Sequence, residues 1–222
     1  SEMCIRDSIC TAQALLATMA GFYAVYHGPE GIRTIAERIH SIAVFLEKSI
    51  NRLGYKQVNA QYFDTLRFAL PDTISAQQIR TIALSKEVNL RYFKNGDVGM
   101  SIDETTDIAA VNVLLSIFAI AAGRDWEKTS DVPMASSISA EMKRQSAYLT
   151  HEVFNKYHTE TEMMRYIKRL DRKDISLAQS MISLGSCTMK LNAAAEMLPL
   201  SRPEFMGMHP LVPEDQAEGY RE

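Results

Sequence analysis

The sequence has few of the features that mark several large classes of protein. It holds three cysteines among 222 residues, in neither a Cys-x-x-Cys pair nor a disulfide framework, so we expect a reducing compartment. No apolar run is long enough to span a bilayer, and no secretory signal opens the chain. The formal net charge is −3 and no basic stripe stands out, which argues against nucleic-acid binding. No histidine pair has the spacing of a metal-binding helix, so we predict no metal site.

Helical periodicity dominates the first part of the chain. Residues 10–26 are rich in Ala, Leu and Met and predict a helix that is buried on most sides. Gly28 can end this helix, and Pro29 suits the first turn of the next one, which Gly54 stops. The second helix has apolar residues at a three-to-four spacing: Ile32, Ile35, Ile39, Ile42, Phe45, Leu46, Ile50 and Leu53. His40 lies beside this stripe, so we interpret it as a structural histidine.

The pattern then alternates between strand and helix. Residues 65–70 alternate apolar with polar side chains, which predicts a half-buried strand. Ser75 opens a capping box and therefore a helix. The Asn95-Gly96 pair predicts a hairpin, and Asp107 starts an apolar helix. This order of helix, strand, helix, hairpin and helix predicts an α+β layer, a small antiparallel sheet covered by helices on one face.

The remainder of the chain is less regular. Periodicity fades over residues 124–157, which predicts a connector. Thr159 and Glu162 form a second capping box and start another helix. Residues 1–8 fit neither a helical nor a strand period, and we interpret them as non-native. Neither end completes an element, so we expect the chain to be a fragment.

One stretch, LGSCTMKLN, gathers small hydrogen-bonding groups around a cation. Its neutral hydrogen-bonding residues are Ser186, Cys187, Thr188 and Asn192, and Lys190 supplies a positive charge. A helix starting near Asn192 would turn its free amide groups toward the same loop and favour an anion. These residue types fit a carboxylate or phosphate site, and they also fit a polar turn before a surface helix. Cys187 as a nucleophile is disfavoured, because the cysteine-enzyme signatures are absent.

Several segments resemble the glycine cleavage system P-protein family, the glycine decarboxylases that depend on pyridoxal 5'-phosphate (PLP). The matching segments are ICTAQALLA (9–17), FYAVYHGPEG (22–31), YFDTL (62–66), NLRYF (89–93), SIDET (101–105) and the run over 149–192. The likeness covers almost everything after residue 8, and the run from Thr150 to Asn192 is its most specific part. Ser183 and Arg202 stand where the family frequently has proline and tryptophan.

The resemblance implies an α/β fold class and a domain organisation. We expect the α+β small domain of a fold-type I PLP-dependent enzyme, followed by the start of a second PLP-enzyme-like half. The expected parts are a C-terminal small domain of the first half over 9–123, the connector over 124–157, and the beginning of the second half over 158–222. A second half or subunit would be a partner, in a homodimer or heterotetramer. The implied location is the bacterial cytoplasm or the mitochondrial matrix, with no secretion.

The resemblance also implies a reaction. Glycine is decarboxylated at PLP, and its aminomethyl group is transferred to the lipoyl arm of the H-protein. Residues Ser186, Cys187, Thr188, Lys190 and Asn192 would line that cofactor or substrate site, together with His209. The family's Schiff-base lysine lies in a His-Lys motif beyond Glu222, so Lys190 is not that lysine and we expect the chain alone to be inactive. Two alternatives are another fold-type I PLP enzyme and a non-catalytic helical interaction subunit.

Overall fold

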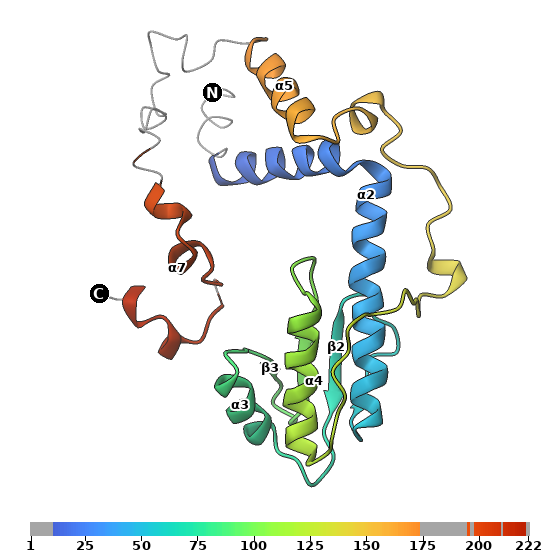
Figure 1. The fold of residues 1–222 in the computed structure, drawn as a ribbon, viewed down its shortest axis with the longest axis vertical. Coiled ribbons are helices and arrows are strands. Elements are labelled where there is room, and N and C mark those ends of the chain that lie inside the picture. Colours follow the sequence, from blue (N-terminus) through green and yellow to red (C-terminus); the bar gives the residue numbers. More distant parts are fainter. Residues whose placement is uncertain (1–10, 174–194, 196–197, 210, 221–222) are drawn as a thin grey trace, which may run out of the picture. The chain divides into compact units, whose positions relative to one another are not determined.

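The computed structural model describes residues 11–173, 195, 198–209 and 211–220, and the chain divides into two compact units (Figure 1). One unit comprises residues 29–148, and the other comprises residues 1–28 with 149–222. Helix α2 (Thr11–Arg52) changes unit at Gly28, where the backbone leaves helical geometry with φ 62° and ψ −177°. Glycine adopts a positive φ at no steric cost, and Pro29 can begin the next helical turn because its missing N–H is not needed there. The predicted break between two helices is therefore confirmed.

The unit over 29–148 contains a four-stranded antiparallel sheet in the order β1-β2-β4-β3. Its strands are β1 (Lys56–Gln57), β2 (Thr65–Ala69), β3 (Arg91–Tyr92) and β4 (Val98–Ser101). In the central pair, Thr65 of β2 lies opposite Ser101 and Phe68 lies opposite Val98 of β4. Strands β3 and β4 form the predicted hairpin around Gly96, whose φ of 91° matches the need for glycine in a tight turn.

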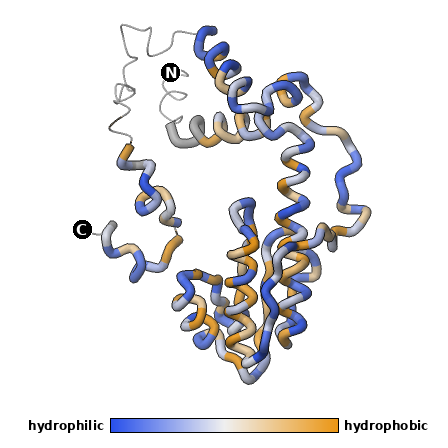
Figure 2. Tube along the Cα trace, in the orientation of Figure 1, coloured by the Kyte–Doolittle hydropathy of each residue, from blue (hydrophilic) through white to orange (hydrophobic). Residues whose placement is uncertain are grey.

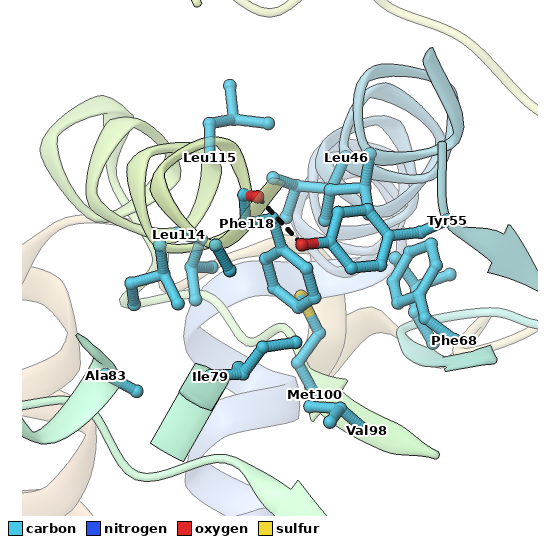
Figure 3. Packing of buried hydrophobic residues seen from close by; sticks show 14 of the residues in the cluster. Leu46, Tyr55, Phe68, Ile79, Ala83, Val98, Met100, Leu114, Leu115 and Phe118 are labelled. Carbon is cyan, nitrogen blue, oxygen red and sulfur yellow. Dashed lines mark hydrogen bonds between the residues drawn. The ribbon is translucent and has the colours of Figure 1, made fainter. Parts of the chain in front are cut away.

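Three helices build the core with one face of this sheet: the second part of α2, α3 (Ala76–Ser85) and α4 (Ile108–Ala122). Leu66 and Phe68 of β2 are fully buried, as the alternating pattern predicted, and the Phe68 ring packs against the ring of Phe118 of α4 (Figure 3). Helix α4 has eight buried residues, which confirms the apolar helix. The large apolar side chains among them, such as Leu115, Ile117 and Phe118, each contribute roughly 1.5–3 kcal/mol on burial, so this unit contains its own hydrophobic core.

Side chains pair polar groups at the starts of two helices and at one point inside this core. The side chains of Ser75 and Asp107 accept the N–H groups of Gln78 and Ala110, which confirms both predicted N-caps. Tyr55 is 3% exposed, and its hydroxyl donates to the Phe118 carbonyl at 2.8 Å (Figure 3). Burial raises the pKa of Tyr55 to about 12.

The opposite face of the sheet is polar. Arg67 alternates with the buried residues of β2, so its side chain projects from this second face. Its Nε donates to the Asp97 carboxylate at 2.7 Å, and its guanidinium lies 4.2 Å from the ring centroid of Phe93. A nearby loop after β4 holds Asp103, where hydrogen bonds from the side chain and backbone of Thr105 lower the pKa of the carboxyl group.

In the other unit, the first part of α2 packs against α5 (Glu160–Asp171). Thr159 caps α5 by accepting the Glu162 N–H, so the predicted start of this helix is confirmed. Met163 of α5 is buried, and the Tyr166 ring meets the Phe22 ring edge to face at a centroid distance of 6.4 Å. The described residues after α5 contain only short helices: η4 (Leu198–Ser201), α7 (Pro203–Met206), η5 (Glu214–Gln216) and η6 (Glu218–Tyr220).

The first part of α2 is a helix, but it is much less buried than the sequence predicted. Leu16 is 67% exposed and Met19 is 57% exposed. The expectation of burial on most sides is therefore wrong for the described part of this chain, because α5 meets this helix on the side of Phe22 and leaves Leu16 and Met19 exposed. None of the described helices is both long and apolar enough to cross a membrane.

Candidate functional site

The five residues predicted to line an anion or cofactor site lie outside the described residues. They are Ser186, Cys187, Thr188, Lys190 and Asn192. The sixth, His209, is described: it is exposed, and its Nδ1 accepts the N–H of Leu211 at 3.0 Å. Its carbonyl also accepts the N–H of Val212 at 3.0 Å. His209 thus holds a local turn, and its role beside a cofactor or substrate stays a prediction.

Within the unit over 29–148, a different feature emerges around His40, which is 2% exposed. Its Nε2 accepts the backbone N–H of Ser137 at 2.9 Å, and Nδ1 lies 2.8 Å from the Phe63 carbonyl. An amide N–H can only donate and a carbonyl can only accept, so the ring is the neutral tautomer with its proton on Nδ1. This confirms His40 as a structural histidine, and it identifies the backbone segment that the histidine holds.

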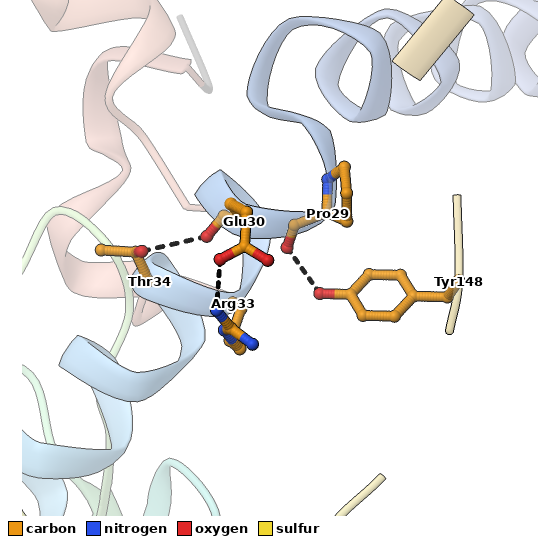
Figure 4. A network of polar contacts seen from close by, with 5 residues as sticks. All are labelled: Pro29, Glu30, Arg33, Thr34 and Tyr148. Carbon is orange, nitrogen blue, oxygen red and sulfur yellow. Dashed lines mark hydrogen bonds and ion pairs between the residues drawn. The ribbon is translucent and has the colours of Figure 1, made fainter. Parts of the chain in front are cut away.

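That segment belongs to the strap, which we define as residues 134–148. Ser41, one residue after His40, accepts the N–H of Ala135 at 3.0 Å through its hydroxyl oxygen. At the other end of the strap, the Tyr148 hydroxyl donates to the Pro29 carbonyl at 2.6 Å (Figure 4). Hydrogen bonds therefore attach the strap to the second part of α2 near residue 135 and at residue 148. Within the strap the only regular element is one short helical turn, η1 (Ala140–Met142).

The strap and α2 enclose a groove with a volume of about 1020 Å³. Apolar side chains line it: Ile32 comes from α2, Ile138 and Met142 from the strap, and Phe63 from the loop before β2. Charged side chains that line the groove are Glu30, Arg33, Glu37, Lys143 and Arg144. Positive and negative side chains thus both line the groove, and neither sign of charge predominates along it.

Several of these charged groups already have partners. Arg33 forms an ion pair with Glu30 one helical turn earlier, and the Glu30 carbonyl accepts the Thr34 hydroxyl at 2.9 Å (Figure 4). The Arg144 guanidinium lies 5.0 Å from the ring centroid of Tyr148. These contacts shape the walls of the groove and leave its apolar lining as the surface that a ligand or another segment would meet.

The groove is suited to binding and packing. His40 is not available as a general base, because both of its ring nitrogens are engaged with the backbone. Among the described residues no lysine is buried, and Lys143, the lysine that lines the groove, is exposed. In the part of the chain that the structure describes, no three His, Cys, Asp or Glu side chains gather as a metal ion would require.

Comparison with known proteins connects this architecture to a family. A family model for the glycine cleavage system P-protein matches residues 5–118, which is more than half of the chain and includes α2, the sheet and most of α4. The chain belongs to the glycine cleavage system P-protein family.

Individual members of the P-protein family are very similar to this chain. Glycine dehydrogenase (decarboxylating) of Bacteroides fragilis strain YCH46 is 83% identical over 216 residues, which are 97% of this chain and 23% of that protein. The protein of the same name from Bacteroides thetaiotaomicron is 82% identical over the same shares. The one from Flavobacterium johnsoniae is 50% identical over 96% of this chain and 22% of its own length. The chain thus spans less than a quarter of the length of these P-protein relatives.

No pattern in the sequence indicates the strap or the groove. Residues 134–148 have no periodicity, and the connector prediction said nothing about what they contact. The available clue was His40 itself, since a histidine beside an apolar helical stripe needs partners for two ring nitrogens. A search for those partners could not have reached Ser137, because the two residues are 97 positions apart in the sequence.

Proposed function

We propose that the chain is part of a glycine dehydrogenase (decarboxylating), and that the longer protein decarboxylates glycine and passes the aminomethyl group to the lipoyl arm of the H-protein. The observation that carries this proposal is the 83% identity over 97% of the chain to a protein of that name. PLP would supply the electron sink for the decarboxylation. The family membership favours this proposal over another fold-type I PLP enzyme and over a non-catalytic interaction subunit.

Two parts of the chain would contribute differently. The unit over 29–148 would act as a scaffold, since it has its own core and both ring nitrogens of the histidine in its groove are engaged with the backbone. The stretch containing Ser186, Cys187, Thr188, Lys190 and Asn192 would supply polar contacts to the substrate carboxylate or the cofactor phosphate, because amide, hydroxyl and ammonium groups all donate to anions. We retain the boundaries 9–123, 124–157 and 158–222 as part of the same proposal.

The isolated chain should be inactive, since the family's anchoring lysine belongs to a motif that this sequence does not contain. The assay is the exchange of labelled bicarbonate into glycine, with PLP and H-protein added, and the Bacteroides fragilis enzyme provides the positive control. Exchange above background by the isolated chain would contradict this part of the proposal.

A chimera tests the activity of the longer protein. In it, this chain replaces the 216 matched residues of the Bacteroides fragilis enzyme, and we expect glycine-bicarbonate exchange close to that of the parent. A folded chimera without exchange activity would overturn the proposal.

The same chimera tests the predicted site. Lys190→Ala should lower exchange activity by at least about tenfold, the order expected for losing one charge-assisted contact to an anion. Lys128→Ala is the matched control, since Lys128 is exposed and lies in the described unit, outside the groove. Equal activity of the two variants would remove Lys190 from the site.

A further inference from the structure

The strap is held to α2 mainly by hydrogen bonds, because it buries little apolar surface. Every residue of the strap lies in the described part of the chain, and none of them is buried. Figure 2 shows mixed hydrophilic and hydrophobic colours along the strap, whereas α4 in the core of the same unit is mostly hydrophobic. Each hydrogen bond to α2 therefore carries a large share of the attachment of the strap.

Two backbone N–H groups of the strap bind to acceptors of different chemistry. The Ala135 N–H donates to the Ser41 hydroxyl oxygen at 3.0 Å, and the Ser137 N–H donates to His40 Nε2 at 2.9 Å. A hydroxyl oxygen accepts at any pH in this range, but an imidazole nitrogen accepts only while it carries no proton. Nδ1 of His40 already holds its proton in the hydrogen bond to the Phe63 carbonyl. A second proton and the Ser137 N–H thus compete for one lone pair on Nε2.

The surroundings of His40 favour the neutral ring in the attached state. Neither ring nitrogen is hydrogen-bonded to a carboxylate that would stabilise an imidazolium. From the loop before β2, the rings of Phe63 and Tyr62 lie beside it at centroid distances of 5.7 Å and 5.8 Å; burial, with the charge of Glu47 adding, raises the pKa of Tyr62, which therefore stays neutral in acid. Residues 134–139 of the strap have no ionisable side chain. The charged side chains that line the groove together with His40 are Glu30, Arg33 and Glu37 of α2 and Lys143 and Arg144 of the strap.

We infer that His40 is a proton-sensitive latch: a second proton on Nε2 removes the acceptor of the Ser137 N–H, and the strap detaches from α2 around residue 137. The Ser137 hydroxyl lies 3.3 Å from Nε2 and could accept the new N–H of the ring, but the backbone N–H of Ser137 still loses its acceptor. Since the strap forms one wall of the groove, acid loosens that wall. The inference rests on the contacts of His40 and does not depend on the proposed reaction.

The size of the effect follows from the need for a neutral ring. A histidine that is free in water takes up its second proton below about pH 6.5, so the attachment is intact above this pH and weakens about tenfold for each pH unit below it. The test is amide hydrogen exchange of the full chain, expressed as protection relative to an unstructured peptide at the same pH. Between pH 7.5 and pH 5 we expect the protection of the Ser137 N–H to fall by about ten- to thirtyfold. Protection of Phe118 in the core helix α4 should change by less than about threefold.

His40→Gln is the matched control. The side-chain oxygen of glutamine can accept the Ser137 N–H in place of Nε2, and it does not titrate. In this variant the protection at Ser137 should vary by less than about threefold over the same pH range. In the wild type, the ring ¹⁵N shifts of His40, followed by NMR, should report protonation with the same pH midpoint as the loss of protection at Ser137.

Three results would overturn the inference. The first is unchanged protection of Ser137 in the wild type between pH 7.5 and pH 5. The second is an equal fall in protection in His40→Gln, which would assign the effect to another group. The third is protonation of the His40 ring at a midpoint clearly separate from the loss of protection. If glutamine does not hold the strap at pH 7.5, the comparison of the two midpoints in the wild type decides the question.

Discussion

Replacing Tyr55 by phenylalanine should change both the stability of the protein and how that stability depends on pH. The hydroxyl donates to the Phe118 carbonyl inside the core at 2.8 Å, and the side chain is 3% exposed. Tyr55→Phe removes this hydrogen bond while keeping the ring, which packs edge to face on Phe118 at 5.0 Å. At pH 7 we expect a loss of about 1 kcal/mol in the free energy of unfolding, the usual contribution of one intramolecular hydrogen bond.

The pH dependence follows from the pKa of Tyr55, which burial raises from 10.0 to about 12. A raised pKa in the folded state means that the unfolded chain ionises first, so the stability is intact below pH 10 and is lost as pH rises toward about 12. One pH unit above 10 therefore costs the wild type about 1.4 kcal/mol. The phenylalanine variant has no such group and escapes this loss. The two proteins should have nearly equal stability near pH 11, although the variant is the weaker one at pH 7.

The assay is urea unfolding of the full chain, followed by circular dichroism at several pH values from 7 to 11. Other groups also titrate in this range, so the informative quantity is the difference between wild type and variant. Tyr23→Phe serves as a control for the substitution itself, because Tyr23 is 42% exposed and lies in the other unit. A constant difference between wild type and Tyr55→Phe across the whole range would refute the argument from burial.

Two further substitutions test the break in α2 and the attachment of the strap. Gly28→Ala should destabilise the protein by about 1–3 kcal/mol, because φ is 62° and a Cβ would lie 2.7 Å from His158 Cε1 and from the Phe154 carbonyl oxygen. Gly21→Ala is the control: a Cβ at Gly21 meets nothing within 4 Å, so this substitution should stabilise the protein by about 0.5–1 kcal/mol. Equal effects of the two substitutions on the free energy of unfolding in urea would contradict this prediction. His40→Ala removes the acceptor of the Ser137 N–H, and amide hydrogen exchange at Ser137 should accelerate by about tenfold or more, as expected for losing at least about 1.4 kcal/mol of protection. An unchanged exchange rate at Ser137 would show that His40 does not hold the strap.

The predictions that the structure confirmed all rest on neighbouring residues. The Ser75 and Asp107 caps, the Asn95-Gly96 hairpin and the break at Gly28 each depend on local backbone geometry, which a few adjacent residues determine. For the same reason the spacing of apolar residues was enough to place the helices and β2. The family resemblance was also confirmed, because it depended on the order of residues and not on their positions in space.

The candidate site was less accessible to such reasoning. The residues Ser186, Cys187, Thr188, Lys190 and Asn192 were chosen by type and by resemblance, and their role stays a prediction. The strap could not be anticipated at all, since its attachment joins Ser137 to a histidine 97 positions earlier. Residues so far apart meet only when the intervening sheet and helices have packed.

The sequence by itself therefore determined the longer helices, β2, the β3–β4 hairpin, their order and the family, because periodicity, caps and turns act over a few residues. Tertiary structure alone decided the pairing of β1, the strap, the groove and the exposure of Leu16 and Met19 on the first part of α2. Periodicity shows that a helix has an apolar side, but whether that side is covered depends on which other parts of the polypeptide pack against it.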